Sequence, residues 1–358
     1  MTISWMRSSS NGSSSSSATS SLIVTLLLSV LSVVVVKVNG QNFNNEATTG
    51  ETFVGTVSTA TAPPGDTHQN RDDDTTFHNR EILLNLYQST SGLHWNNANN
   101  WLQQDTDVCD WFGITCYIPS QTSDERRIGH IKSIDLTKNH LVGTISSDIF
   151  EIPYLKELIL DDNTNIDSID LNGLQHAQFL TTLAMSNTNV GMNDLVNINS
   201  AGTSSSIEIL HITQCKNLQG NLPLSLFDLT NLKELYGNFN KFSGSIPTYI
   251  GRLSNLEKVY LYNNDLTGQL PTEFGLLTHL EVLTLGQNAL SGSIPQIEFN
   301  LLTNLQTLSL QREGNGNEKG GKENGMIGSI PSFSNFKYLT ELYLNNQNFN
   351  GNLDTNFL

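Results

Sequence analysis

One apolar pattern recurs through the last two-thirds of this chain and constrains its fold more than any other feature. The pattern L-x-x-L-x-L-x-x-N-x-L-x-G-x-[IL]-P reads most cleanly from Leu256. Nine copies are spaced 24 to 27 residues apart, except for a last interval of 34, and they begin at Ile131, Leu155, Leu180, Ile207, Leu232, Leu256, Leu280, Leu305 and Leu339. A fixed period of this length predicts a stack of equivalent units, each of which contacts only its neighbours.

The first half of the repeat predicts a strand followed by a sharp turn. In L-x-L, two apolar side chains flank one outward residue, which is typical of a short strand with one buried face. Stacked copies would pair these strands into a parallel sheet, and the remainder of each repeat provides the crossover. A buried asparagine after the strand can bond backbone groups that the turn leaves unpaired. It occurs at Asn139, Asn163, Asn240, Asn264 and Asn288.

The second half, G-x-[IL]-P, predicts a bend on the opposite side of the stack. Glycine permits backbone conformations that other residues resist, and proline cannot donate to a sheet, which favours extended chain outside a sheet. The apolar residues that follow, such as Ile250 and Leu253, should pack inward as a short helical or 3₁₀ turn. We therefore assign the repeat-defining residues to the core and the bends, and none of them to chemistry.

Four copies depart from the pattern. The copies from Leu155 and Leu180 lack G-x-I-P, which predicts an irregular convex side there. Gly237 occupies a strand position that is normally leucine and should leave a local packing deficit. The copy from Leu305 is interrupted by a polar, glycine-rich insert, residues 311–325, which reads as a protruding loop.

A second motif lies upstream of the repeats and agrees with them. Residues 109–116 read CDWFGITC, and they follow a helical pattern in REILLNLYQST and two tryptophans, Trp95 and Trp101. Cap and repeats together resemble plant-type leucine-rich repeat proteins: receptor-like kinase ectodomains, receptor-like proteins and polygalacturonase inhibitors. The resemblance implies an α/β leucine-rich repeat solenoid, a right-handed horseshoe or superhelix with a parallel sheet on its concave face and a 3₁₀ or irregular convex side. It also implies ligand or partner binding.

The N-terminus resembles a secretory signal. Arg7 precedes an apolar run, residues 22–36, and small residues before Gln41 offer a cleavage site. The alternative is an uncleaved anchor, but the run is shorter than the ~20 apolar residues that a membrane span needs. Both interpretations place the repeats outside the cytosol. The expected organisation is a signal at 1–40, a disordered linker rich in Thr, Ala and Asp at 41–76, a cap at 77–130 and repeats at 131–358.

Charge and cysteines agree with an extracellular protein. The chain has 18 basic and 34 acidic residues, so its phosphate-repelling net charge of -16 argues against nucleic-acid partners. An oxidising compartment permits a disulfide between Cys109 and Cys116, which would stabilise a small cap. Cys215 replaces the repeat asparagine and is expected to be a buried free thiol.

The sequence contains no convincing catalytic, cofactor or metal site. Residues 316–322 read GNEKGGK, close to a phosphate-binding loop, but Glu323 stands where the magnesium-ligating Ser or Thr would be. The eight histidines include no H-x-x-x-H pair, and no G-x-S-x-G motif occurs. We therefore expect a chain without enzymatic activity of its own. The alternative that a kinase domain follows Leu358 is kept.

The outward strand residues form the expected binding surface, because solenoids of this kind usually bind through their concave sheet. Tyrosine combines a large contact area with a hydroxyl group, the usual profile of a binding hot spot. Tyr236, Phe239, Tyr260 and Tyr262 are expected to form one aromatic cluster on two adjacent strands, with His211 and Asn238 beside it. The alternative is that these tyrosines simply suit a pleated surface.

The predicted function is extracellular recognition of a protein, peptide or glycan. The alternatives are a secreted enzyme inhibitor and a structural or adhesive wall protein. Membrane attachment would use residues 22–36 or a segment after Leu358, because the last copy is incomplete and an uncapped repeat would expose its core.

Overall fold

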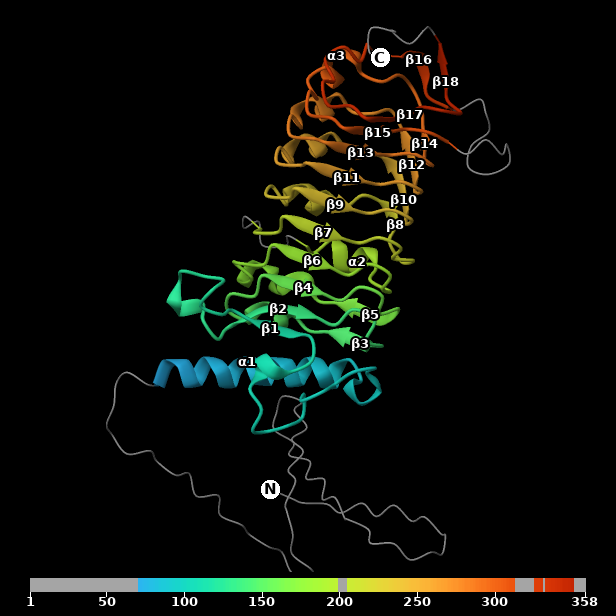
Figure 1. Cartoon of the computed structure of the whole chain (residues 1–358). Helices are drawn as coiled ribbons and strands as arrows, with labels where there is room; N and C mark the ends of the chain where they lie inside the picture. Colours follow the sequence, from blue (N-terminus) through green and yellow to red (C-terminus); the bar gives the residue numbers. More distant parts are fainter. Residues whose placement is uncertain (1–69, 199–204, 313–324, 331, 351–358) are drawn as a thin grey trace, which may run out of the picture. The chain divides into compact units, whose positions relative to one another are not determined.

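The computed structural model describes residues 70–198, 205–312, 325–330 and 332–350. They belong to one compact unit, Asp66–Leu358, in which strands and turns are stacked from the cap to the last repeat (Figure 1). The predicted signal at 1–40, nearly all of the predicted linker and most of the insert lie outside the described residues.

A ten-stranded sheet runs through the unit and takes one strand from every repeat. The strands, in their order in the sheet, are β1 (Ile114–Cys116), β2 (Ile131–Asp135), β4 (Glu157–Ile159), β6 (Thr182–Ala184), β7 (Ile209–His211), β9 (Glu234–Tyr236), β11 (Lys258–Tyr260), β13 (Val282–Thr284), β15 (Thr307–Ser309) and β17 (Glu341–Tyr343). The first pair is antiparallel and all later pairs are parallel. This arrangement confirms the predicted solenoid.

Constant register places the central residue of each strand in the core. Leu235 pairs in register with Leu210 on one side and Val259 on the other, and none of the three is more than 1% exposed. The first and third residues of these strands point outward and are only half-buried. They form what we call the open sheet face, the surface that the sequence predicts to be concave.

The opposite side of the stack holds one short helical turn in most repeats, as predicted. These turns are η4 (Ser147–Glu151), η5 (Leu171–His176), η6 (Leu224–Asp228), η7 (Thr248–Arg252), η8 (Thr272–Leu276) and α3 (Gln296–Phe299). Each buries one or two large apolar side chains, for example Ile250 in η7 and Phe274 in η8. The turns therefore close the core from the side opposite the sheet.

Narrow sheets form where the chain approaches each bend. A four-stranded sheet joins β8 (Gln219–Asn221), β10 (Lys241–Ser245), β12 (Asp265–Gly268) and β14 (Ala289–Leu290). Two smaller sheets pair β3 (Val142–Ile145) with β5 (Asn165–Ile169) and β16 (Ile327–Ser329) with β18 (Asn348–Asn350). The glycine of the bend is thus often part of a strand, and the chain leaves the sheet before the proline. In the copy from Leu180, one of the two that lack the motif, α2 (Met192–Leu195) follows β6.

The repeat asparagines form a buried hydrogen-bonded ladder. All five are at most 6% exposed. Asn264 shows the arrangement: its Nδ2 donates to the carbonyls of Gly237 at 2.9 Å and Leu261 at 3.1 Å, and its Oδ1 accepts the Phe242 amide at 3.1 Å. Each side chain therefore joins its own turn to the preceding repeat.

The N-terminal cap begins earlier than expected. Helix α1 runs from Asn70 to Ser89, so its first residues lie inside the segment that the sequence assigns to the linker. Short turns η1 (Gly92–His94), η2 (Val108–Asp110) and η3 (Glu125–Arg127) complete the cap. Tyr87, Trp95 and Trp101 are buried against one another, with ring centroids 4.7 to 6.1 Å apart. The predicted Cys109–Cys116 disulfide is present.

Two expectations about the core have different outcomes. Cys215 is a fully buried free thiol, as predicted, and its Sγ lies 3.2 Å from the Met185 carbonyl. The packing deficit expected at Gly237 is wrong. A β-carbon placed there would lie 2.9 Å from the Leu261 side chain, which already fills the space.

Candidate functional site

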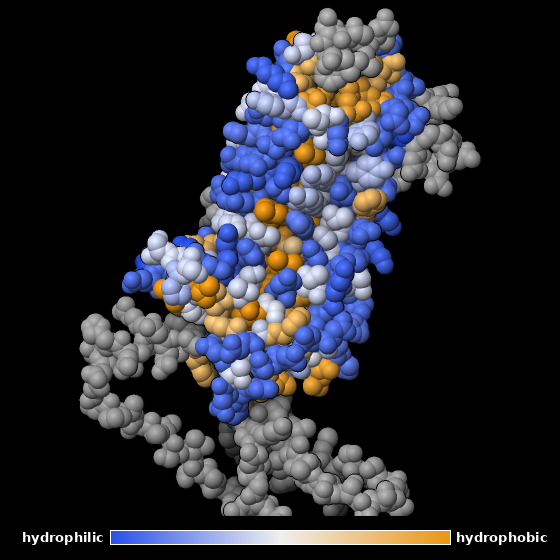
Figure 2. All heavy atoms as spheres, in the orientation of Figure 1, coloured by the Kyte–Doolittle hydropathy of each residue, from blue (hydrophilic) through white to orange (hydrophobic). Residues whose placement is uncertain are grey.

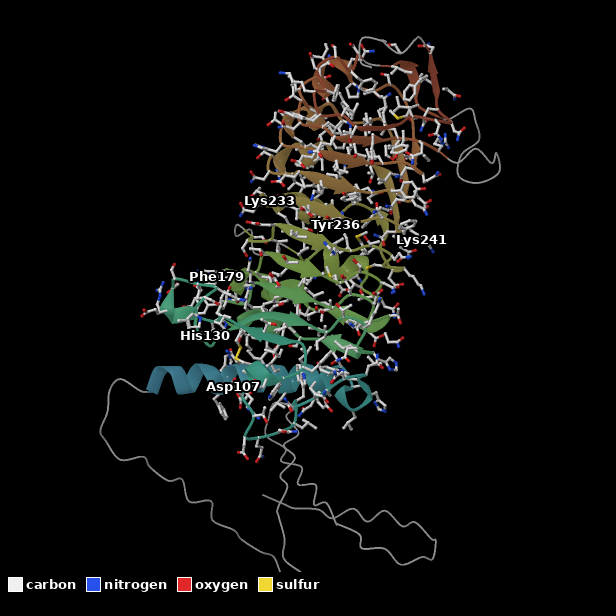
Figure 3. The ribbon with its side chains drawn as sticks, viewed as in Figure 1. Asp107, His130, Phe179, Lys233, Tyr236 and Lys241 are labelled. Carbon is white, nitrogen blue, oxygen red and sulfur yellow. A yellow bond between two sulfur atoms is a disulfide. The ribbon has the colours of Figure 1, made fainter. Side chains whose placement is uncertain are left out.

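The candidate site occupies the centre of the open sheet face. Strands β7, β9 and β11 lie side by side there, and their outward residues contact one another. Tyr236 lies near the middle of the stack and Lys233 toward its margin (Figure 3). Figure 2 shows apolar and neutral residues along the centre of this face between hydrophilic margins.

Three rings form what we call the stacked row: His211, Tyr236 and Tyr260. Strand register places them directly opposite one another. The ring centroids of His211 and Tyr236 lie 4.3 Å apart, and those of Tyr236 and Tyr260 lie 4.8 Å apart with only 10° between their planes. The spacing of parallel strands, about 4.8 Å, explains why identical rings in register stack. Tyr236 therefore has a ring on each side, whereas Tyr260 has Thr284 as its other neighbour in register.

The carboxylate of Glu234 accepts hydrogen bonds from Tyr236 in the stacked row and from the neighbouring Lys258. The Tyr236 hydroxyl donates to Glu234 at 2.5 Å, and the Lys258 ammonium donates to the same carboxylate at 2.9 Å. Burial acts to raise the pKa of Glu234, but the bonds from Tyr236 and Lys258 outweigh it and leave that pKa below its usual value. Burial and the Glu234 charge raise the pKa of Tyr236, so its hydroxyl remains a donor at neutral pH.

A second carboxylate lies at the other end of the row. Asp161 Oδ2 is 3.9 Å from His211 Nδ1, and its Oδ1 accepts the Ser186 amide at 2.6 Å. Burial lowers the pKa of His211, although Asp161 and Glu234 act in the opposite direction. Burial raises the pKa of Asp161, which the Ser186 amide opposes. The imidazole is therefore mainly neutral at pH 7.

Phe239 and Tyr262 form a separate row beside the first. Their ring centroids lie 5.6 Å apart at 68°, and Phe239 is 47% exposed. Phe239 has a φ of 57°, a left-handed conformation that turns the chain at the end of the strand. Asn238 Oδ1 accepts the Tyr262 amide at 2.8 Å and so links the two repeats.

The structure thus corrects the single predicted cluster to two rows. Among the described residues, no ring contact joins the stacked row to the pair Phe239–Tyr262. The two rows occupy different positions of the repeat. Among the described residues, each of these rings contacts only rings at its own repeat position in neighbouring repeats. His211, predicted only as a neighbour, is a full member of the stacked row.

Two acidic residues of this surface are not among the predicted site residues. Both form side-chain contacts with another repeat: Asp161 reaches His211, two copies further along, and Glu208 Oε2 accepts Lys233 Nζ from the next copy at 3.0 Å. Lys233 thus forms its ion pair with Glu208, while the carboxylate of Glu257 in the next copy acts on it only at longer range. An alignment of the copies places these two acids on the outward surface. It does not predict which side chains they contact, because those contacts depend on side-chain direction.

The described part of the chain contains no group of three or more metal-ligating side chains. Within that same part, no helix is both long and apolar enough to cross a membrane.

Two family models match the chain. One is described as Leucine rich repeat N-terminal domain and covers residues 79–117, the cap with its helix and disulfide. The other is described as Leucine Rich Repeat and covers residues 255–277, which include β11 and η8. The chain is a leucine-rich repeat protein. Its cap and its repeats are thus matched independently, in the order in which the sequence predicts them.

Curated relatives of this leucine-rich repeat protein occur in Arabidopsis thaliana. A receptor protein kinase-like protein is 39% identical over 66 residues, which are 18% of this chain and 8% of that protein. A probable leucine-rich repeat receptor-like serine/threonine-protein kinase is 34% identical over 71 residues, which are 20% of this chain and 10% of that protein. These matches confirm the plant-type resemblance, and they span only small parts of the relatives.

A solved structure shows the same fold. The leucine-rich repeat ectodomain of the Arabidopsis thaliana receptor kinase GASSHO1/SCHENGEN3, in complex with CASPARIAN STRIP INTEGRITY FACTOR 2, is 24% identical with a TM-score of 0.57. The likeness covers 75% of this chain and 29% of that one.

Proposed function

We propose that this leucine-rich repeat protein binds a peptide or a protein segment on its open sheet face, outside the cytosol. The stacked row His211–Tyr236–Tyr260 carries the proposal, because its rings are fixed in place before a ligand arrives. Ordered aromatic side chains lose little entropy on binding and are typical of hot spots. The kinship with receptor kinases supports a recognition role, and the cap disulfide supports an oxidising compartment.

The geometry of the row favours peptide over glycan. A sugar ring stacks on an aromatic face, whereas both faces of Tyr236 are occupied by His211 and Tyr260. Ring edges and hydroxyl groups suit the hydrogen bonds and apolar side chains of a polypeptide. We therefore favour a peptide or protein ligand over a glycan.

The charge of the surface favours a basic ligand. Glu208 and Glu234 are neutralised by Lys233 and Lys258. The neighbouring Glu257, by contrast, forms no side-chain hydrogen bond or ion pair among the described residues. Together with the net charge of -16, this surplus attracts lysine and arginine side chains.

The test uses the full secreted chain against an array of synthetic decapeptides and an array of wall glycans. Basic peptides are expected to bind, and the double variant Tyr236→Ala/Tyr260→Ala should lose that binding while it keeps the circular dichroism of the folded chain. Tyr343→Ala is the matched control, because Tyr343 has the same repeat position and contacts no ring among the described residues. Unchanged peptide binding by the folded double variant, or binding to glycans alone, would refute the proposal.

A further inference from the structure

A second aromatic row lies on the flank of the stack, outside the open sheet face. The residue just before each repeat start is aromatic in the first three copies: His130, Tyr154 and Phe179. The rings of His130 and Tyr154, and those of Tyr154 and Phe179, have centroids 5.1 Å apart. His130 and Phe179 lie on the same flank in Figure 3, where the teal segment 117–130 projects in Figure 1.

In later copies, the position of the flank row is often occupied by an asparagine that hydrogen-bonds to the preceding repeat. At the same repeat position, asparagine side chains donate to a backbone carbonyl of the preceding repeat, with donor–acceptor distances of 2.8 to 2.9 Å, at Asn231, Asn255 and Asn304. Phe179 has no donor and cannot form this bond. A repeat that gives up a local stabilising contact at adjacent positions often does so for function.

One arginine of the cap lies over the flank row. The Arg127 guanidinium lies 4.7 Å from the Phe179 ring centroid and 5.5 Å from that of Tyr154. Its Nε is 3.4 Å from Asp124 Oδ2, an ion pair, but this buried nitrogen has no hydrogen-bond partner among the described residues. Among the described residues, its two terminal nitrogens form no hydrogen bond. The guanidinium thus lies over two rings with N–H donors that no described residue accepts.

Arg127 lines a cleft of about 430 Å³ between loop 117–130 and the first two repeats. This volume lies within the range of ligand sites, roughly 300 to 1,000 Å³. Ile152, Pro153 and Ala177 give the cleft apolar walls beside the rings. Arg126 is bound by Asp124 through two contacts of 2.9 and 3.0 Å, and Glu151 also lines the cleft. The two acidic and two basic side chains that line the cleft balance in formal charge, so a monoanion meets less repulsion there than a dianion.

We propose that this cleft binds a small aromatic carboxylate, whose carboxylate pairs with the Arg127 fork and whose ring packs on Tyr154 and Phe179. Paired N–H donors of guanidinium match the two oxygens of a carboxylate, and an adjacent ring adds stacking contact. The site is separate from the open sheet face and does not depend on the function proposed for it.

The experiment titrates hydrocinnamate into the full secreted chain and follows binding by calorimetry and ligand-observed NMR. Hydrocinnamate should bind, whereas hydrocinnamyl alcohol, which lacks the carboxylate, should not. Arg127→Gln and Arg127→Lys should weaken binding at least about tenfold, the cost of one charge-assisted hydrogen bond. Tyr343→Ala, at an exposed position on strand β17, should leave the affinity unchanged.

A second variant separates binding from folding. Phe179→Asn introduces the residue that regular copies use, so it should keep the melting temperature and still lose hydrocinnamate affinity. The proposal fails if hydrocinnamate does not bind, if the alcohol binds equally, if phenyl phosphate binds more tightly, or if the folded Arg127 variants bind as well as the natural chain. In each of these cases the aromatic–arginine contact only attaches loop 117–130 to the repeats.

Discussion

Strands β9 and β17 carry the same tripeptide, Glu-Leu-Tyr, in the same phase of the repeat, but their side chains have different surroundings. In β9, Tyr236 is stacked between two rings and bonded to Glu234. In β17, Tyr343 is 45% exposed, and among the described residues it contacts no other ring. Within the described ranges, the Glu341 carboxylate accepts only the Thr307 hydroxyl, at 3.3 Å.

The difference comes from the neighbouring strands and not from the tripeptide. Strand β9 lies between β7 and β11, which place His211 and Tyr260 in register with Tyr236. Strand β17 pairs with β15, where Ser309 stands in register with Tyr343. A tyrosine at this position becomes part of an ordered surface only when adjacent repeats also present rings.

The largest expected difference concerns the asparagine ladder beneath the two strands. Asn240 follows β9, is 6% exposed and bonds the Cys215 amide and the Ile212 carbonyl, each at 2.7 Å. Asn240→Ala would leave buried backbone groups unpaired and should lower the free energy of unfolding by about 3 kcal/mol. At the matching position after β17, Gln347 is only half-buried, and Gln347→Ala should cost about 1 kcal/mol because water can replace its bonds.

Urea unfolding followed by circular dichroism measures both changes, with the slope of the transition checked for each variant. Equal losses at the two positions would show that the ladder is no more important under β9 than under β17.

A smaller difference is expected for the two tyrosines. Tyr236→Ala removes two ring contacts and one charged hydrogen bond, so it should lower the free energy of unfolding by about 2 kcal/mol. Tyr343→Ala, at an exposed position without ring contacts, should change it by less than about 0.5 kcal/mol. The same urea experiment measures this pair. Losses of similar size would mean that the stacked row adds no stability beyond that of a single exposed tyrosine.

The smallest expected effect is a pH dependence that belongs to β9 and its neighbours. His211 has a folded-state pKa below its usual 6.5, because burial disfavours the charged imidazole. Between these two pKa values the unfolded chain binds more protons than the folded chain, so the free energy of unfolding should fall as pH decreases through this window. Asp161, with its raised pKa, contributes the opposite slope at lower pH.

His211→Gln should flatten the decrease below pH 6.5 when urea midpoints are measured across a pH series. A His94→Gln variant in the cap controls for the loss of one histidine. An unchanged slope in His211→Gln would assign the pH dependence to other groups.

The fold could be read from the sequence because it depends on local periodicity. The positions that Leu235 and Asn240 occupy recur at fixed intervals, and each position has the same structural role in every copy. The strands, the asparagine ladder and the turns were therefore predictable. The start of α1 was not, because the polar residues after Asn70 carry no apolar stripe to indicate a helix. The void expected at Gly237 was also wrong, because the side chain that fills it, Leu261, comes from the next repeat.

The candidate site was only partly predictable. Aligning the copies placed Tyr236 and Tyr260 together, because parallel strands keep register across repeats. It could not separate the stacked row from Phe239 and Tyr262, since ring orientation depends on packing. The flank row and its contact with Arg127 were not predicted. Loop 117–130 lies outside the repeat, and its position follows from contacts with two different copies.

The sequence by itself determined the repeat period, the buried positions, the cap motif and the strands that would be neighbours, because each follows from spacing along the chain. Only the tertiary structure decided which outward side chains touch, which acids are neutralised and where a cleft opens. Those outcomes depend on the directions of side chains from different repeats, and spacing alone does not specify them. The identical tripeptides of β9 and β17 show the division: one local sequence leads to two environments, set by residues 24 to 34 positions away.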